Sequence, residues 1–231
     1  MEGFVITGSS SGLGKALAEY ALDNTKAPVI GISRKCTIEH DRYTHLSIDL
    51  TDNEVVQSFD WPAVEGVSNW MLINNAGSLG PVMPLAQIKG EDYARLLQLN
   101  VVSPTLLMGK CLTATQGKGR IINISSGAGK YPIMGWAAYG SSKAALDLAS
   151  EIAAAENPDA YIRAVSPGII DTPMQAEIRE SSADDFPGVQ QFLDYKEYGD
   201  LASPEEVAKK IFYILDHPEV APGTLFSVRD L

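Results

Sequence analysis

The chain has 231 residues, of which 45% are hydrophobic, and its formal net charge is -11 at pH 7. This length and composition allow one sizeable buried core and exclude an intrinsically disordered chain. The negative charge and the lack of a dense Lys/Arg run argue against nucleic-acid binding. The two cysteines, Cys36 and Cys111, are too few for a disulfide framework or a metal cluster. The N-terminus shows no secretory signal and no long apolar run follows, so we expect a cytoplasmic protein without a membrane span.

Short β-rich runs alternate with longer helical stretches almost to the end of the chain. Strands are expected at Phe4–Thr7, Val29–Ser33, His45–Ile48, Met71–Asn74, Arg120–Ile124, Ile162–Val165 and Leu225–Val228, all of them buried. Helices are expected at Gly12–Asn24, Glu54–Phe59, Glu91–Leu99, Val101–Thr115, Tyr139–Glu156 and Pro204–Asp216. This alternation predicts parallel strands joined by right-handed crossovers, with helices on both faces of the sheet. No linker divides the chain, so residues 1–231 are expected to form a single α/β domain.

The segment Thr172–Ala202 breaks this alternation, because it contains no clear strand. Aromatic side chains are scattered among short polar residues along it. Segments of this length without regular structure are usually functional loops or plain surface excursions. We favour a substrate lid over 172–202, with the surface excursion as the alternative.

A glycine-rich turn follows the first expected strand and opens the first helix. Its glycines, spaced G-x-x-x-G-x-G within Thr7–Gly14, allow a sharp turn and a close approach of the backbone to a ligand. The helix N-terminus adds unpaired N–H groups and a partial positive charge. Because a strand precedes the turn and a helix follows it, the pattern predicts a cradle for the pyrophosphate of a dinucleotide rather than a simple turn. The expected contacts are Gly8, Ser10, Ser11, Gly12, Leu13 and Gly14.

Ser33-Arg34-Lys35 ends the second expected strand, about 20 residues after the last of these glycines. An acidic residue at this place binds the ribose 2′-hydroxyl of NAD. An arginine can instead pair with a 2′-phosphate, and a serine hydroxyl can add a hydrogen bond. A solvated basic turn is the alternative, but the position relative to the glycines favours NADP(H), held by Ser33 and Arg34.

Tyr139 and Lys143 lie at i and i+4 of one expected helix, so their side chains share a face. Ser126 stands 13 residues before Tyr139 and just beyond the strand Arg120–Ile124, at the end of a parallel strand where ligands bind. Considered alone, Tyr139 and Lys143 could be a chance surface pair. The neighbouring Ser125 could also supply the serine hydroxyl.

With these residues the chain resembles the short-chain dehydrogenase/reductase family over essentially its full length. The resemblance rests on five features in the family's order: Thr7–Gly14, Asn74-Asn75-Ala76-Gly77, Asn100, Ser126 with Tyr139 and Lys143, and Pro167-Gly168 followed by Thr172. It implies a Rossmann-type doubly wound parallel sheet of about seven strands. It also implies a catalytic tetrad of Asn100, Ser126, Tyr139 and Lys143, in which the spacing to Tyr139 matches Ser126 rather than Ser125. The implied cofactor contacts are Asp49, Leu50, Asn75, Ala76, Gly77, Tyr139, Lys143, Pro167, Gly168, Ile170 and Thr172.

This tetrad suits the reduction of a ketone to an alcohol. A carbonyl group that accepts a hydride develops negative charge on its oxygen and needs a hydrogen-bond donor and a proton source. We expect Ser126 to supply the hydrogen bond and Tyr139 the proton. Lys143, together with the nicotinamide charge, is expected to lower the pKa of the Tyr139 phenol from its free value of about 10. The resemblance implies that Asn100 interrupts its helix and holds a water that passes protons to Lys143.

Within the family, the compact length, Ser33-Arg34 and the C-terminal Gly223–Leu231 resemble the bacterial sepiapterin and benzil reductase-like branch. This C-terminus lacks the Asp-Gly-Gly close of fatty-acid-type members. We therefore expect an NADPH-dependent reductase of a small ketone or dicarbonyl. The alternatives are an oxidative secondary-alcohol dehydrogenase and a non-catalytic NADP-binding sensor. The expected substrate pocket comprises Gly127, Ala128, Tyr131, Met134, Trp136, Met174, Phe186 and Phe192.

The helices Val101–Thr115 and Tyr139–Glu156 carry more apolar residues than one core face is expected to bury. These residues are Leu106, Met108, Cys111, Leu112, Leu146 and Leu148. The resemblance implies that these helices pair across a two-fold axis, which is the commonest way to close a homo-oligomer. We therefore expect a homodimer or homotetramer.

Overall fold

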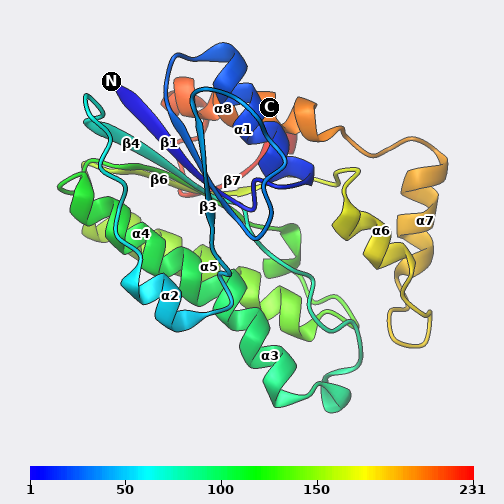
Figure 1. Cartoon of the computed structure of the whole chain (residues 1–231). Coiled ribbons are helices and arrows are strands. Elements are labelled where there is room, and N and C mark those ends of the chain that lie inside the picture. Colours follow the sequence, from blue (N-terminus) through cyan, green and yellow to red (C-terminus); the bar gives the residue numbers. More distant parts are fainter.

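A parallel sheet of seven strands forms the centre of the computed structural model, which describes residues 1–231 (Figure 1). The strands lie in the order β3-β2-β1-β4-β5-β6-β7. Their bounds are β1 (Glu2–Thr7), β2 (Val29–Ser33), β3 (Tyr43–Ser47), β4 (Asn69–Asn74), β5 (Arg120–Ile124), β6 (Tyr161–Ser166) and β7 (Leu225–Ser227). Because the order reverses between β1 and β4, the carboxyl ends of these two strands flank the crevice where open α/β sheets bind ligands.

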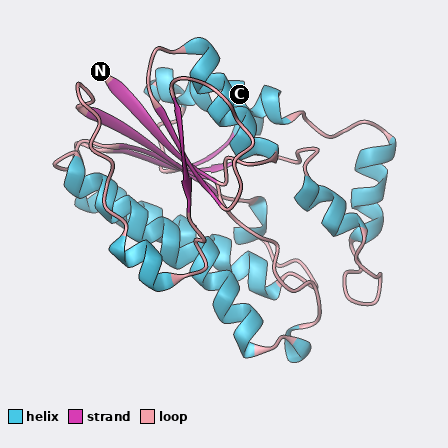
Figure 2. Ribbon diagram, viewed as in Figure 1, coloured by secondary structure: helices cyan, strands magenta, loops and turns pink.

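Helices cover both faces of this sheet, as the alternation of strands and helices predicts (Figure 2). Helices α1 and α8 lie on one face, and α2, α4 and α5 lie on the other (Figure 1). The α-helices are α1 (Gly12–Asn24), α2 (Asn53–Ser58), α3 (Gly90–Leu97), α4 (Ser103–Ala114), α5 (Ala137–Glu156), α6 (Pro173–Arg179), α7 (Val189–Glu197) and α8 (Pro204–Asp216). Short 3-10 turns are η1 (Leu85–Gln87), η3 (Gly127–Gly129), η4 (Pro218–Val220) and η5 (Val228–Asp230), and η2 (Gln98–Val102) is a π-helical turn.

Alternate side chains of β1 enter two different hydrophobic cores. Phe4 and Ile6 belong to the cluster that includes α1 and α8. Val5 points to the opposite face and belongs to the cluster that includes Leu107 and Met108 of α4. A strand with period-two alternation between two buried faces is the central strand of a doubly wound sheet.

The two edge strands differ from the expectation that all seven strands are buried. β3 and β7 are only partly buried. Each of them pairs with a single neighbour, so one edge of the strand lacks a neighbouring strand to cover it. β3 also begins earlier than expected, at Tyr43, whose hydroxyl forms a hydrogen bond with Ser9 Oγ at 2.9 Å. The other expected elements are confirmed with small shifts at their ends.

The segment 172–202 contains two helices, α6 and α7, that the sequence did not predict. Both are short and are separated by Pro187-Gly188, so neither shows a periodic apolar pattern over enough turns to be recognised. The segment is closed at its base, because Ala202 N donates to Ile169 O and Asp171 N donates to Ala202 O, each at 3.0 Å. α6 and α7 therefore lie together to one side of the sheet as one excursion (Figure 1).

Half of the apolar residues expected to need a partner subunit are buried within the chain itself. These core residues are Met108, Cys111 and Leu146. Leu106 and Leu112 are partly buried against the same core. Leu148 is 58% exposed, and Ile152, one helical turn later on α5, is 50% exposed. The candidate interface is therefore narrower than expected, since α4 and α5 use most of their apolar residues to cover the sheet. None of the helices combines the length and the apolar character needed to span a bilayer.

Candidate active site

One large cavity, of about 1320 Å³, lies at the carboxyl ends of the strands. Its walls come from segments that follow β1, β2, β4, β5 and β6. Most cofactor residues expected from the sequence line it: Gly8, Ser10, Ser11, Gly12, Leu13, Ser33, Arg34, Asp49, Leu50, Asn75, Ala76, Gly77, Tyr139, Lys143, Pro167, Gly168, Ile170 and Thr172. Ser126 lines the same cavity, whereas Gly14 and Asn100 do not.

The glycine-rich turn is bonded to the end of β4. The Thr7 hydroxyl oxygen accepts hydrogen bonds from the backbone N–H groups of Asn75 and Ala76, each at 2.9 Å. Gly8 and Gly12 have φ angles of +69° and +51°, in the left-handed region that glycine adopts without strain. No side chain caps the start of α1, so the N–H groups of its first turn can bind an anion.

Gly14 lies where α1 packs closely against the glycine-rich turn, and its expected contact with the cofactor stays a prediction. A Cβ atom at this position would lie 2.2 Å from Gly8 O and 2.3 Å from Asn75 Nδ2. The same Asn75 amide nitrogen donates to Thr7 O at 3.0 Å. Any side chain at Gly14 would therefore separate α1 from the turn that β1 and β4 hold in place.

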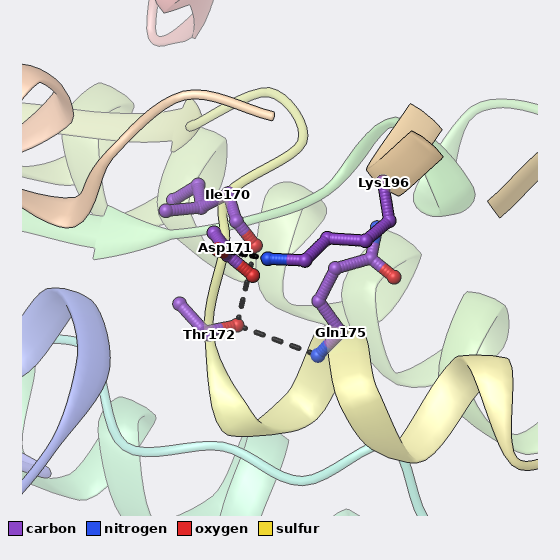
Figure 3. A network of polar contacts seen from close by, with 5 residues as sticks. All are labelled: Ile170, Asp171, Thr172, Gln175 and Lys196. Carbon is purple, nitrogen blue, oxygen red and sulfur yellow. Dashed lines mark hydrogen bonds and ion pairs between the residues drawn. The ribbon is translucent and has the colours of Figure 1, made fainter. Parts of the chain in front are cut away.

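The start of α6 lies close to the start of α1 at the cavity wall. A Cβ atom at Gly12 would lie 3.3 Å from Thr172 Cγ2. Thr172 Oγ1 accepts a hydrogen bond from Gln175 N at 3.4 Å and caps α6 (Figure 3). In the same view the Lys196 ammonium of α7 forms an ion pair with Asp171 at 2.6 Å. This ion pair ties α7 to the loop that carries Thr172, although exposed pairs of this kind contribute less than about 1 kcal/mol.

The Ser33-Arg34 turn forms the β2 end of the cavity. Arg34 lines the cavity and forms no ion pair. The Ser33 hydroxyl donates to Lys35 O at 2.8 Å and lies 3.2 Å from His45 Nε2, so it helps to hold this turn, and its expected contact with a phosphate stays a prediction. Asp49 is also at this end, and hydrogen bonds from Thr51 hold the pKa of its carboxyl below the usual value. Arg34 and Asp49 therefore lie near each other at the β2 end of the cavity, as the sequence predicts.

Tyr139 and Lys143 are buried side chains of α5 that reach the cavity wall. Burial raises the pKa of the Tyr139 phenol, and a hydrogen bond with Ser126 opposes this rise. Burial lowers the pKa of Lys143 to about 8, and the charge of Asp147 opposes this fall. Both shifts follow from the cost of holding a charge away from water.

The pKa of the Tyr139 phenol is raised in the chain alone, whereas the expected lowering includes the charge of the nicotinamide as well as that of Lys143. The Lys143 ammonium lies 5.7 Å from the centre of the Tyr139 ring and donates a hydrogen bond to Ile124 O at 2.8 Å. Within the chain, the loss of water around the phenol outweighs the charge of a lysine at this distance. A lowered phenol pKa would therefore need a further positive charge in the cavity.

The adjacent serines at the end of β5 have different partners. The Ser125 hydroxyl donates to Asp147 Oδ1 and faces α5. The Ser126 hydroxyl oxygen accepts a hydrogen bond from Ala128 N at 3.2 Å, and its side chain is close enough to Tyr139 to lower the pKa of the phenol. Ser126 is therefore the serine that stands beside Tyr139.

Asn100 interrupts its helix, as the resemblance implies, because it lies in the π-helical turn η2 between α3 and α4. Its amide accepts a hydrogen bond from Ser78 N at 3.0 Å and donates to Ser78 O at 2.9 Å and Ser142 Oγ at 3.0 Å. A Cβ atom at Gly77 would lie 3.3 Å from Asn100 Oδ1 and 3.7 Å from Lys143 Nζ. Asn100 thus holds the loop after β4 against α5, and its role in proton transfer stays a prediction.

Six of the eight expected pocket residues line the cavity: Gly127, Ala128, Tyr131, Trp136, Met174 and Phe192. Met134 and Phe186 do not, which corrects their assignment. Met134 is 73% exposed to solvent. Phe186 is fully buried and stacks on Trp136 with ring centres 5.0 Å apart. Phe186 therefore anchors the 172–202 segment on the loop before α5 and forms no part of the wall.

Two arginines that the sequence did not single out also line the cavity, Arg95 of α3 and Arg229 of η5. The positive charge of Arg95 acts on the Asp49 carboxyl. A Cβ atom at Gly168 would lie 3.6 Å from Arg229 Nε. Arg229 follows the last strand, a position that could have indicated its place at the carboxyl edge of the sheet. Nothing local in the sequence places Arg95 there, since the packing of α3 brings it to the cavity.

Comparison with known proteins agrees with this geometry. The family model described as short chain dehydrogenase matches residues 3–183. The chain is 34% identical to the benzil reductase ((S)-benzoin forming) of Bacillus cereus over 98% of both proteins. It is 36% identical to the benzil reductase ((S)-benzoin forming) of Bacillus subtilis (strain 168), over 100% of this chain and 99% of that relative. The solved YIR035C short chain dehydrogenases/reductase from Saccharomyces cerevisiae has a TM-score of 0.86 and 28% identity, covering 99% of this chain and 96% of that one. The chain therefore belongs to the short chain dehydrogenase family of oxidoreductases, in the branch that its residues indicate.

Proposed function

We propose that this chain reduces a ketone or dicarbonyl to the alcohol with NADPH. The observation that carries the proposal is the grouping of Ser126, Tyr139 and Lys143 on one wall of the cavity, with Tyr139 and Lys143 buried one helical turn apart. A protein that only binds a dinucleotide has no need of this combination. The likeness to two benzil reductases makes benzil the first substrate to test.

A dinucleotide suits the cavity for two reasons that the chain itself provides. The uncapped start of α1 and the left-handed Gly8 and Gly12 offer N–H groups to a pyrophosphate. Arg34 offers an unpaired guanidinium at the β2 end, where a 2′-phosphate would lie. We therefore propose NADP(H) as the preferred cofactor, with Ile170 and Thr172 beside its nicotinamide.

When bound, the reduced nicotinamide supplies the hydride. Ser126 donates a hydrogen bond to the carbonyl oxygen, and Tyr139 transfers its phenol proton to the same oxygen. The positive charge of Lys143 stabilises the phenolate that this transfer leaves on Tyr139. Asn100 completes the tetrad by holding the loop after β4 against α5 and by binding a water that returns a proton.

The segment Thr172–Ala202 acts as a substrate lid in this proposal. It begins at the cavity wall with Thr172, and Met174 and Phe192 on its two helices line the same cavity. Its closed base at Ile169–Ala202 holds the two ends of the segment together, so we expect a movement of the two helices to leave the sheet in place. Closing such a lid excludes water from the reaction.

Two further properties belong to the same proposal. The exposed Leu148 and Ile152 of α5 would pair with a second copy, which makes the protein a homodimer or homotetramer. The exposed free thiol of Cys36 and the unpaired Cys111 suit the reducing cytoplasm.

The direct test measures NADPH consumption by the purified protein with benzil and a panel of other diketones and ketones. We expect consumption that depends on the carbonyl compound, formation of the alcohol, and a much slower reaction with NADH. Tyr139→Phe is the matched control, because it keeps the ring and removes only the phenol oxygen. Tight NADPH binding without reduction of any compound would indicate a binding module, and turnover only from an alcohol and NADP⁺ would indicate an oxidative enzyme.

A further inference from the structure

Asp147 is a buried carboxyl group that the proposed reaction does not use. It lies on α5 one helical turn after Lys143 and is 6% exposed. It forms no ion pair, and its hydrogen-bond partner within the chain is the Ser125 hydroxyl. A carboxylate buried with so few partners costs stability, so a different residue would serve better if packing were its purpose.

The first effect of Asp147 is on the end of β5. Ser125 is held from two sides, since its N–H donates to Val165 O at 2.9 Å and its hydroxyl donates to Asp147. Ser126 is the next residue, so the backbone that carries its hydroxyl has little freedom to rotate. The carboxyl group on α5 therefore sets where the Ser126 hydroxyl stands relative to Tyr139.

The second effect is on the charge of Lys143. The hydrogen-bond acceptor of this ammonium is the neutral Ile124 carbonyl, so its positive charge has no partner at contact distance. Asp147 provides the negative charge that acts on it and opposes the effect of burial on its pKa. The ionisable groups that act on the Asp147 carboxyl are Lys130, Lys143 and Glu151.

These contacts form a repeated pattern between α5 and β5. Lys143 binds the carbonyl of Ile124, and Asp147, one turn later, binds the hydroxyl of Ser125. Two successive residues of the strand end are thus held by two successive turns of the helix.

We propose that Asp147 is a positioning residue that fixes Ser126 through Ser125 and keeps Lys143 in its charged form. Its catalytic consequence rests on the proposed function, but its effect on Lys143 does not. The two effects can be tested separately, because Asp147→Asn removes the charge and keeps a hydrogen-bond acceptor. Ser125→Ala removes the hydrogen bond and keeps the charge.

The effect on Lys143 is measured by NMR titration of protein carrying ¹³C next to the lysine ammonium groups, with Lys143→Arg used to assign the signal. We expect the midpoint of Lys143 to move to lower pH by about 1 unit in Asp147→Asn. Glu151→Gln is the matched control: it removes the same charge from an exposed position on α5 and should leave the midpoint in place. Asp147→Glu keeps the charge and should retain the original midpoint. An unmoved midpoint in Asp147→Asn would overturn the proposed control of Lys143, and so would a shift of equal size in Glu151→Gln.

The effect on Ser126 is measured by kinetics of carbonyl reduction. Ser125→Ala should lower kcat about tenfold without moving the pH profile, while Asp147→Asn should move the high-pH limb of kcat/KM by the shift that NMR gives. Unchanged kcat in Ser125→Ala would overturn the positioning of Ser126. If Ser125→Ala lowered kcat as much as Ser126→Ala does, Ser125 would be the catalytic serine, and the proposed positioning of Ser126 would be overturned as well. If the unmodified protein reduces no carbonyl compound, the proposed function fails, while the NMR titration still decides the role of Asp147 toward Lys143.

Discussion

The Lys143 ammonium donates a hydrogen bond of 2.8 Å to the carbonyl oxygen of Ile124, the last residue of β5. This bond joins the helix that carries Tyr139 to the strand end that carries Ser126. Its acceptor is neutral, so the bond orients the ammonium without cancelling its charge. The protonation state of Lys143 is therefore governed by burial and by Asp147, which together place its pKa at about 8.

We expect the rate of carbonyl reduction to fall as the pH rises through about 8. The pKa of Lys143 lies below the ordinary lysine value, so its charged form is present below about pH 8 and is lost above it. Without this charge, the phenolate form of Tyr139 that remains after proton transfer is less stable. The measurement is kcat/KM as a function of pH, with Lys143→Arg as the comparison, because arginine keeps its charge throughout. If kcat/KM of Lys143→Arg falls at the same pH, the fall belongs to the titration of a group other than Lys143.

Tyr139→Phe should bind NADPH with little change and lose about 10²–10⁴ in kcat, as is typical of losing a general acid. The cradle of α1 and Arg34 are untouched by this substitution. Lys143→Ala should weaken both turnover and cofactor binding. Binding is measured by fluorescence titration with NADPH, and turnover by its consumption. Near-normal turnover in Tyr139→Phe would mean that the proton comes from elsewhere.

Arg34→Ala should weaken NADPH binding by about 1.5–3 kcal/mol, the loss expected for a hydrogen bond to a charged group. The affinity for NADH should change little, because NADH lacks the phosphate that Arg34 would bind. Lys35→Ala is the control, since Lys35 is exposed and does not line the cavity. Equal kinetic constants for NADPH and NADH in the unmodified protein would contradict the proposed preference.

Leu148→Asp combined with Ile152→Asp should abolish the proposed oligomer, because both side chains are exposed apolar groups on one face of α5. The molecular mass is measured by sedimentation at micromolar concentration. Tyr213→Asp on α8 is the control, as Tyr213 is 46% exposed but lies on the opposite layer. A monomeric unmodified protein would rule out the interface.

The backbone amides of 172–202 should exchange hydrogen more slowly once cofactor and carbonyl substrate are present together. The expected reason is closure of the lid, which buries amides that are exposed without substrate. The amides of β5 serve as an internal reference, because they are bonded into the sheet in either case. Equal protection of the segment under both conditions would remove its gating role.

The arrangement of Ser126, Tyr139 and Lys143 could be predicted because it depends on local geometry alone. Residues at i and i+4 of a helix share a face, and the end of a parallel strand lies at the carboxyl edge of the sheet. The burial of Met108 and Cys111 could not be predicted in this way. It depends on how α4 lies against the sheet, which its own apolar pattern does not specify.

The partners of individual polar groups were also beyond the sequence. Ser33 binds the carbonyl of Lys35, and Ser125 binds Asp147, which is distant in the chain. Gly14 belongs to a cofactor-binding motif, yet it lies where Gly8 and Asn75 leave no room for a side chain. Each of these contacts is decided by tertiary packing, so a motif can locate the site without assigning every residue in it.

The closed base of the 172–202 excursion makes the proposed lid a unit that can be replaced separately from the scaffold. Because Ala202 is bonded to Ile169 and Asp171, the stretch between these residues can change in length and sequence while the register of β6 stays the same. We therefore expect a change within this stretch to alter the proposed substrate range while the sheet stays as it is. Grafting the corresponding stretch from a relative onto Ile169 and Ala202 is accordingly a direct route to an engineered change of substrate range.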